Sequence, residues 1–118
     1  MLNQVSQPTA DLHPTEKRNP NQARGFREIT NAMYQVHLDK NADYSPANIL
    51  GVGEIGLIVR MWDKMTRLLS LLGFDVEVKF KGYHGPKEAR NESVDDSFMD
   101  MAVYSIIAML YRQGKWGN

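Results

Sequence analysis

Three carboxylates late in the sequence have the spacing of ligands on one helix face. Glu92, Asp96 and Asp100 are four residues apart, and Tyr104 follows one turn later. Stacked like charges repel, and oxygen ligands suit Mg²⁺ or Mn²⁺, so we take the three acids as candidate metal-binding and catalytic residues and Tyr104 as a substrate contact. An alternative is that Ser93 caps this helix and Asp96 favours its positive end, which leaves Asp100 unexplained.

A basic stripe precedes these acids. Arg60, Asp63, Lys64 and Arg67 occupy positions i, i+3, i+4 and i+7, which lie on one side of a helix. The cations could clamp a phosphate group, with Asp63 as a further substrate contact. The alternative is a solvated face on which Asp63 pairs with Arg67.

A polar loop offers a further set of substrate contacts. Lys40, Asn41, Asp43 and Tyr44 supply a charge, amide and carboxylate contacts, and a ring for stacking. An ordinary loop that ends a helix is equally compatible with this composition. If the chain is an enzyme, the acids would hold the metal, the metal would polarise a phosphoryl oxygen, and the basic stripe would neutralise the polyphosphate.

Composition removes several other classes of chemistry. The 118 residues contain no cysteine, which excludes disulfides, thiolate catalysis and zinc sites built from cysteine. Lys+Arg and Asp+Glu number 14 each, so nucleic-acid binding stays open only through a local patch such as the basic, partly aromatic arm at residues 79–87. Charges interrupt the longest apolar run, which predicts no membrane span. The absence of cysteine is compatible with a protein of the reducing cytoplasm.

Hydrophobic periodicity predicts the elements that would position these residues. Apolar side chains at intervals of three and four favour helices, and alternation over Phe74 to Tyr83 favours a strand or hairpin. Gly73 and Gly114 are placed to end the two longest helices. The predicted helices are Arg24 to Leu38, a short one after Ser45-Pro46, Glu54 to Leu72, and Ser93 to Gln113.

The predicted fold is mainly α: a compact helical bundle with a short β arm or hairpin between the last two long helices. Residues 1–21 lack the basic start and apolar stretch of a signal peptide, so we expect an irregular arm followed by a single domain over residues 22–118. The apolar faces are too wide for three helices to cover, which favours a homodimer.

Three blocks, in this order and spacing, resemble the nucleotide-modification-associated domain family found largely in bacteriophages. They are Lys40-Asn41-Ala42-Asp43-Tyr44, then Trp62-Asp63-Lys64-Met65-Thr66-Arg67-Leu68, then Glu92-Ser93-Val94-Asp95-Asp96 leading to Asp100 and Tyr104. The similarity covers roughly Phe26 to Trp116. It implies a phage protein in the host cytoplasm that handles nucleotides, without specifying a reaction.

The chain is more distantly similar to the all-α MazG-like nucleoside triphosphate pyrophosphohydrolases. In that family one helix supplies an E-x-x-E pair and another an E-x-x-D pair for magnesium. Glu92 with Asp95 or Asp96 approximates the second pair. The first pair is missing, because the residue three positions after Glu54 is Leu57. Two nucleotide readings follow: metal-dependent hydrolysis of a nucleoside phosphate, or a binder that sequesters a nucleotide or defence signal. The third reading is an assembly protein whose basic and acidic stripes pair with each other.

Overall fold

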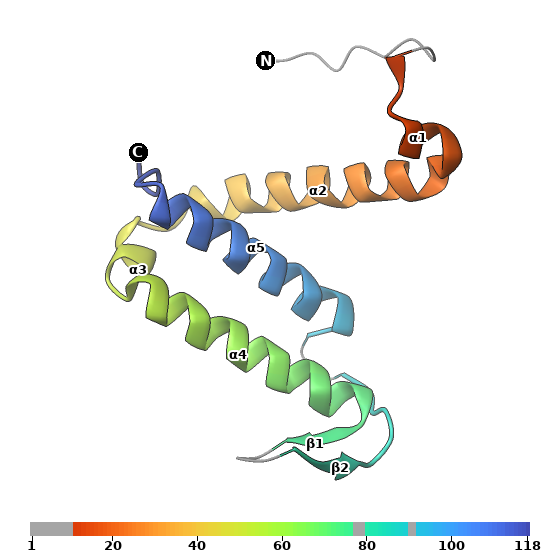
Figure 1. Cartoon of the computed structure of the whole chain (residues 1–118). Helices are drawn as coiled ribbons and strands as arrows, with labels where there is room; N and C mark the ends of the chain where they lie inside the picture. Colours follow the sequence, from red (N-terminus) through yellow and green to blue (C-terminus); the bar gives the residue numbers. More distant parts are fainter. Residues whose placement is uncertain (1–10, 77–79, 90–91) are drawn as a thin grey trace. The chain divides into compact units, whose positions relative to one another are not determined.

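The computed structural model describes residues 11–76, 80–89 and 92–118, and it is mainly helical, as predicted. These residues form five helices and two strands (Figure 1). No helix among them is both long and apolar enough to cross a membrane. By their contacts, the residues of the chain divide into two compact units, Met1–Asp39 and Lys40–Asn118.

The first unit corrects the expectation of an irregular arm. Its described part contains α1 (Pro14–Arg18) and α2 (Pro20–Asn41) as far as Asp39, and residues 1–10 of the expected arm lie outside the described residues. His13 caps α1: its Nδ1 accepts from Thr15 N at 3.0 Å, and its own main-chain N donates to Glu16 Oε1 at 2.8 Å. Histidine is an unusual N-cap, so the capping pattern was missed.

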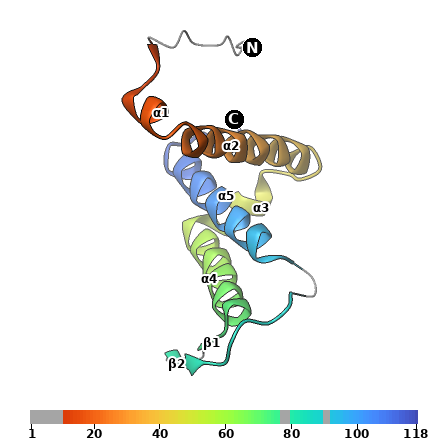
Figure 2. The ribbon, with the colours of Figure 1, turned by 90° about the vertical axis from the view of Figure 1, so that its right-hand side faces the viewer.

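The second unit is built on two long antiparallel helices. Helix α4 (Gly53–Leu72) packs along α5 (Val94–Arg112), and the short α3 (Ala47–Leu50) precedes α4 (Figure 1). Viewed at 90°, α4 runs from α3 to the strands (Figure 2). Gly73 ends α4 with φ 110°, a left-handed conformation that glycine adopts without strain. At the other end of the pair, Arg112 Nη1 donates to Glu54 Oε1 at 2.6 Å.

The core of this unit lies where α3, α4, α5 and the carboxyl-terminal segment meet. Ile49, Leu57, Ile107 and Trp116 form a buried cluster. Trp116 Nε1 also donates to the main-chain oxygen of Pro46 at 3.2 Å, so its one polar group is satisfied inside the core. The half-buried residues packed against the cluster are Val103, Tyr104, Ala108, Leu110 and Tyr111.

The segment between α4 and α5 contains two short strands. β1 (Phe74–Val76) pairs with β2 (Phe80–Tyr83) in antiparallel register, with Phe74 opposite Tyr83 and an irregularity between Asp75 and Val76. Residues 77–79, in the middle of the expected arm, lie outside the described residues. The main chain then returns to the end of α4, where Lys87 N donates to Leu71 O at 3.0 Å.

Candidate functional site

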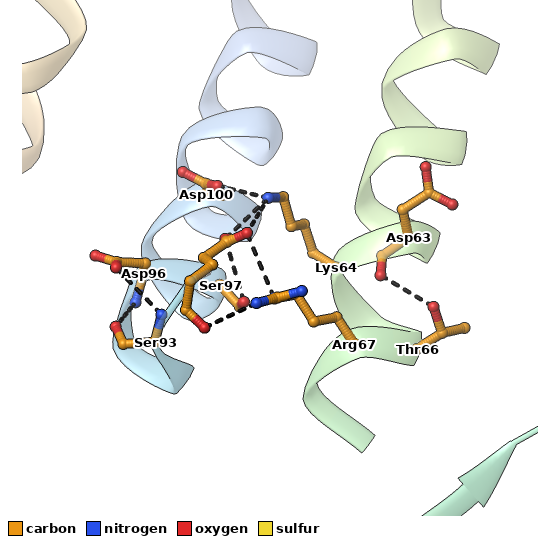
Figure 3. Close-up of polar contacts among 9 residues, drawn as sticks. Asp63, Lys64, Thr66, Arg67, Ser93, Asp96, Ser97 and Asp100 are labelled. Atoms are coloured by element: carbon orange, nitrogen blue, oxygen red, sulfur yellow. Dashed lines mark hydrogen bonds and ion pairs between the residues drawn. The ribbon is translucent and has the colours of Figure 1, made fainter. Parts of the chain in front are cut away.

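Four of the predicted charged residues meet between α4 and the start of α5. Lys64 Nζ donates to both carboxylate oxygens of Glu92, at 2.8 Å each, and pairs with Asp100 Oδ2 at 2.9 Å. Beside them, Ser97 Oγ donates to Glu92 Oε1 at 3.2 Å. We call Lys64, Arg67, Glu92 and Asp100 the charged cluster; Figure 3 shows both basic side chains reaching from α4 towards α5.

Arg67 joins the charged cluster through its guanidinium group. Its Nη2 donates to the main-chain oxygen of Glu92 at 2.9 Å, and its Nε lies 3.5 Å from Glu92 Oε2. The Nε is buried and makes no hydrogen bond to any residue that the structure describes. Arg67 therefore contributes a charge next to Glu92, and its buried Nε has no hydrogen-bond acceptor within the described part of the chain.

The local structure at the start of α5 explains why Glu92 reaches Lys64. Ser93 is the N-cap: its hydroxyl accepts from Asp96 N at 3.0 Å, and Asp96 Oδ2 accepts from Ser93 N at 3.3 Å. Glu92 therefore precedes the helix and does not share a helical face with Asp96 and Asp100, which corrects the expected row of three acids. Asp96 belongs to the helix cap and is exposed, as the alternative reading had it.

The electrostatics of the charged cluster follow from partial burial and short contacts. Its side chains are 21–31% exposed, so water screens them incompletely. Burial disfavours the charged form of Lys64, but hydrogen bonds to Glu92 and Asp100 and the charges of both outweigh it and raise the pKa of its ammonium group. The hydrogen bond from Lys64 in turn lowers the pKa of the Glu92 carboxyl, against the opposing effect of burial.

The carboxylates in this arrangement do not fit the predicted Mg²⁺ or Mn²⁺ site. Lys64 Nζ lies between Glu92 and Asp100, within 2.9 Å of both, where a divalent cation shared by them would have to bind. Asp96 is turned to the helix cap. Among the described residues, no group of three or more His, Cys, Asp or Glu side chains is arranged to hold a metal ion.

The remaining residues predicted on the helices have other surroundings. Arg60 Nη2 donates to the main-chain oxygen of Asn48 at 3.1 Å and so links α4 to α3. Asp63 is exposed and points away from Lys64 and Arg67 (Figure 3), and its main-chain oxygen accepts from Thr66 Oγ1 at 2.9 Å. Tyr104 packs against the hydrophobic core. Of the residues of the basic stripe, Arg60 thus contacts α3 and Asp63 faces solvent. Lys64 and Arg67 belong to the charged cluster.

The polar loop lies at the other end of α4. Lys40 and Asn41 are the last residues of α2, Asp43 N donates to Lys40 O at 3.2 Å, and the side chains of Lys40, Asn41, Asp43 and Tyr44 are exposed. Helical rise of about 1.5 Å per residue places Lys64 about 16 Å along α4 from its start. The contacts that hold the charged cluster together involve none of these loop residues.

Two features escaped the sequence analysis. Ser97 is fully buried beside Glu92, and the only signal for it was a serine one helical turn after the Ser93 cap. The other is a groove of about 480 Å³ in the first unit, formed where α1 and α2 lie together, and none of its lining residues was predicted as a ligand. They are Thr15, Glu16, Gln22, Ala23, Phe26, Arg27, Thr30 and Asn31.

Comparisons with known proteins identified no relative of this chain. No protein-family model, no curated protein and no solved structure matches the chain. The resemblance to the nucleotide-modification-associated domains therefore stays a prediction from the three sequence blocks, and the function has to be argued from the charged cluster itself.

Proposed function

We propose that the protein binds a nucleoside phosphate at the charged cluster. The observation that carries this proposal is the placement of four partly buried charges where α4 meets the start of α5. Apolar side chains of similar size at such positions commonly give equal or greater stability, because they avoid the cost of removing ions from water. Charged groups kept at this cost are typical of functional sites.

Each member of the cluster has a role in this proposal. The Lys64 ammonium and the Arg67 guanidinium, whose Nε makes no hydrogen bond to a described residue, would bind phosphate oxygens. The incoming phosphate would compete with Glu92 for these cations. Glu92 and Asp100, released in part, would then accept hydrogen bonds from sugar hydroxyls or from amino groups of the base.

The proposal is limited to binding, because the Lys64 ammonium takes the position between Glu92 and Asp100 that a shared divalent cation needs. The three sequence blocks support a nucleotide as the ligand. We therefore favour a protein that sequesters a nucleotide, for example a defence signal, because binding alone requires no catalytic group or metal ligand in addition to the charged cluster.

A second candidate function is assembly. The cluster contains two cations and two carboxylates within contact distance, so its charges compensate without a ligand. This is the pairing between the basic and acidic stripes that the sequence left as an alternative. In that case the charged cluster only fixes the packing of α4 against α5, and the surface of the protein binds other proteins in an assembly.

The deciding experiment is a thermal-shift and turnover screen against nucleoside mono- and triphosphates, with and without Mg²⁺ or Mn²⁺. For a bound ligand at 100 times its Kd, we expect stabilisation of about 2.7 kcal/mol, with binding saturating at one ligand per chain and the ligand recovered unchanged. Arg67→Gln should abolish the shift. Arg112→Gln is the matched control, since it removes an exposed arginine that is also paired with a glutamate.

Two results would contradict the proposal. If no nucleotide stabilises the wild-type protein, or if Arg67→Gln retains the full shift while folded, the charged cluster is not the binding site and the assembly reading takes its place. Metal-dependent release of phosphate or pyrophosphate would show that the limitation to binding is wrong.

A further inference from the structure

Helix α4 carries a second apolar face that the other described elements of its own unit do not cover. One face is buried, with Leu57, Leu68 and Leu71 exposed by 0, 3 and 7%. On another side lies an outer stripe whose members, apart from the half-buried Leu69, are exposed by 40–71%. The outer stripe consists of Ile55, Ile58, Trp62, Met65, Leu69 and Leu72.

The spacing of the outer stripe is that of a helix-pairing seam. Its members follow one another at intervals of three, four, three, four and three residues, the alternation of the a and d positions of a heptad repeat. At 3.6 residues per turn this alternation keeps all six side chains on one side of α4. Such a stripe packs best against another helix with the same pattern.

The residues beside the stripe indicate what kind of partner it fits. Val59 and Thr66 flank one side, and Met61 and Leu68 flank the other, so a second identical stripe would meet uncharged side chains along most of its length. The one acid on these flanks, Glu54, is already paired with Arg112. A charged partner would find no complementary group here, whereas self-association is unopposed.

The area of the stripe is also of the right order. At its exposed fractions it presents on the order of 600 Å², at the upper end of the about 300–600 Å² found for the largest apolar patch of a monomer. A stable interface takes about 800 Å² from each partner, and the exposed Val59 and the half-buried Met61 and Thr66 supply part of the difference. Trp62, 56% exposed near the middle of the stripe, is the type of residue that dominates binding energy at interfaces.

From these observations we propose that the outer stripe of α4 is the seam of a homodimer, covered by the same stripe of a second copy. The interface is isologous, as expected for a two-fold symmetric pair. It lies on a different side of α4 from Lys64, whose ammonium faces α5, so it is independent of the proposed nucleotide site.

Analytical ultracentrifugation of the full chain over a hundredfold concentration range tests the seam. We expect the wild-type protein to sediment with twice the mass of one chain. Trp62→Glu, which places a charge at the centre of the seam, should raise the dimer Kd at least tenfold and yield a monomer with unchanged far-ultraviolet circular dichroism. Tyr34→Glu is the matched control, because Tyr34 is an aromatic residue with similar exposure, 64%, outside the stripe.

Several outcomes would overturn the inference. A wild-type monomer at all concentrations would do so, as would a folded Trp62→Glu variant that remains a dimer or a Tyr34→Glu variant that dissociates equally. If Trp62→Glu does not fold, Ile55→Lys at the more exposed end of the stripe is the second variant, and a folded Ile55→Lys protein with unchanged dimer affinity counts against the seam.

Discussion

Replacing Lys64 by methionine tests the charged cluster most directly, because methionine keeps an unbranched side chain and removes the charge. In the wild-type protein, Lys64 Nζ lies 2.8 Å from Glu92 and 2.9 Å from Asp100. Without it the two carboxylates face each other with fewer compensating donors. Removing one partner of a buried ion pair costs about 3–5 kcal/mol, whereas exposed pairs are worth about 0–1 kcal/mol.

The expected loss lies between these limits. The side chains of Lys64, Glu92 and Asp100 are 21–27% exposed, so water screens part of the interaction. We therefore expect Lys64→Met to lower the free energy of unfolding by about 2 kcal/mol at pH 7. Urea slopes of about 1–3 kcal/mol per molar for small domains convert this loss into a midpoint lower by about 1 M.

The assay is urea unfolding followed by circular dichroism at one fixed protein concentration, since association also affects apparent stability. Arg112→Met serves as the control. It breaks the Arg112–Glu54 pair, which spans the same two helices but is far more exposed, so its midpoint should move much less.

The pH dependence provides a second, independent signature. In Lys64→Met, protonation of one carboxyl group relieves the repulsion between Glu92 and Asp100, so the difference from wild type should shrink as the pH falls from 7 to 4. A Lys64→Met midpoint equal to that of the Arg112→Met control at pH 7, or a penalty that stays constant down to pH 4, would refute the description of the cluster.

Two further predictions concern the start of α5. The lowered pKa of the Glu92 carboxyl stabilises the fold above the ordinary glutamate pKa of about 4.3, and this contribution is lost as the pH falls through the folded-state pKa. Glu92→Gln should therefore reduce the fall of the urea midpoint at acid pH. An unchanged acid part of the midpoint-against-pH profile would contradict this prediction. Ser93→Ala should cost about 1 kcal/mol in thermal unfolding by removing the N-cap, while Ser105→Ala, an exposed hydroxyl within the same helix, should cost clearly less.

Helical periodicity was sufficient to predict that the three long helices exist, although α2 extends four residues before and three residues after the predicted Arg24 to Leu38. The apolar spacing and Gly73 placed α4 within one residue of its observed bounds, and Ser93 and Gly114 bracketed α5 closely, because caps and helix-ending glycines act locally. Helix α1 was missed, because its five residues are too few and too polar to show a helical hydrophobic period and its N-cap is a histidine. The division at Asp39 was also missed, because no break in composition marks it within α2.

Only part of the predicted site assembled. The sequence placed Lys64 and Arg67 on one stripe, and the structure brings both to Glu92. Arg60 shares that stripe but contacts Asn48 in α3 instead, and Asp63 faces solvent. Position on a helix face predicts which direction a side chain takes, whereas the neighbour that it meets depends on which segment packs there.

The amino-acid sequence by itself determined the mainly helical class, the apolar and basic character of α4 and the charges available to a site, because period, caps and composition are local properties. Tertiary structure alone decided that Glu92 leaves the helix to pair with Lys64, while Asp96 stays in the cap. It also decided that one apolar face of α4 packs against α5 and that no other described element of the second unit covers the outer stripe. These outcomes depend on contacts between residues far apart in the chain, whose geometry no local pattern encodes.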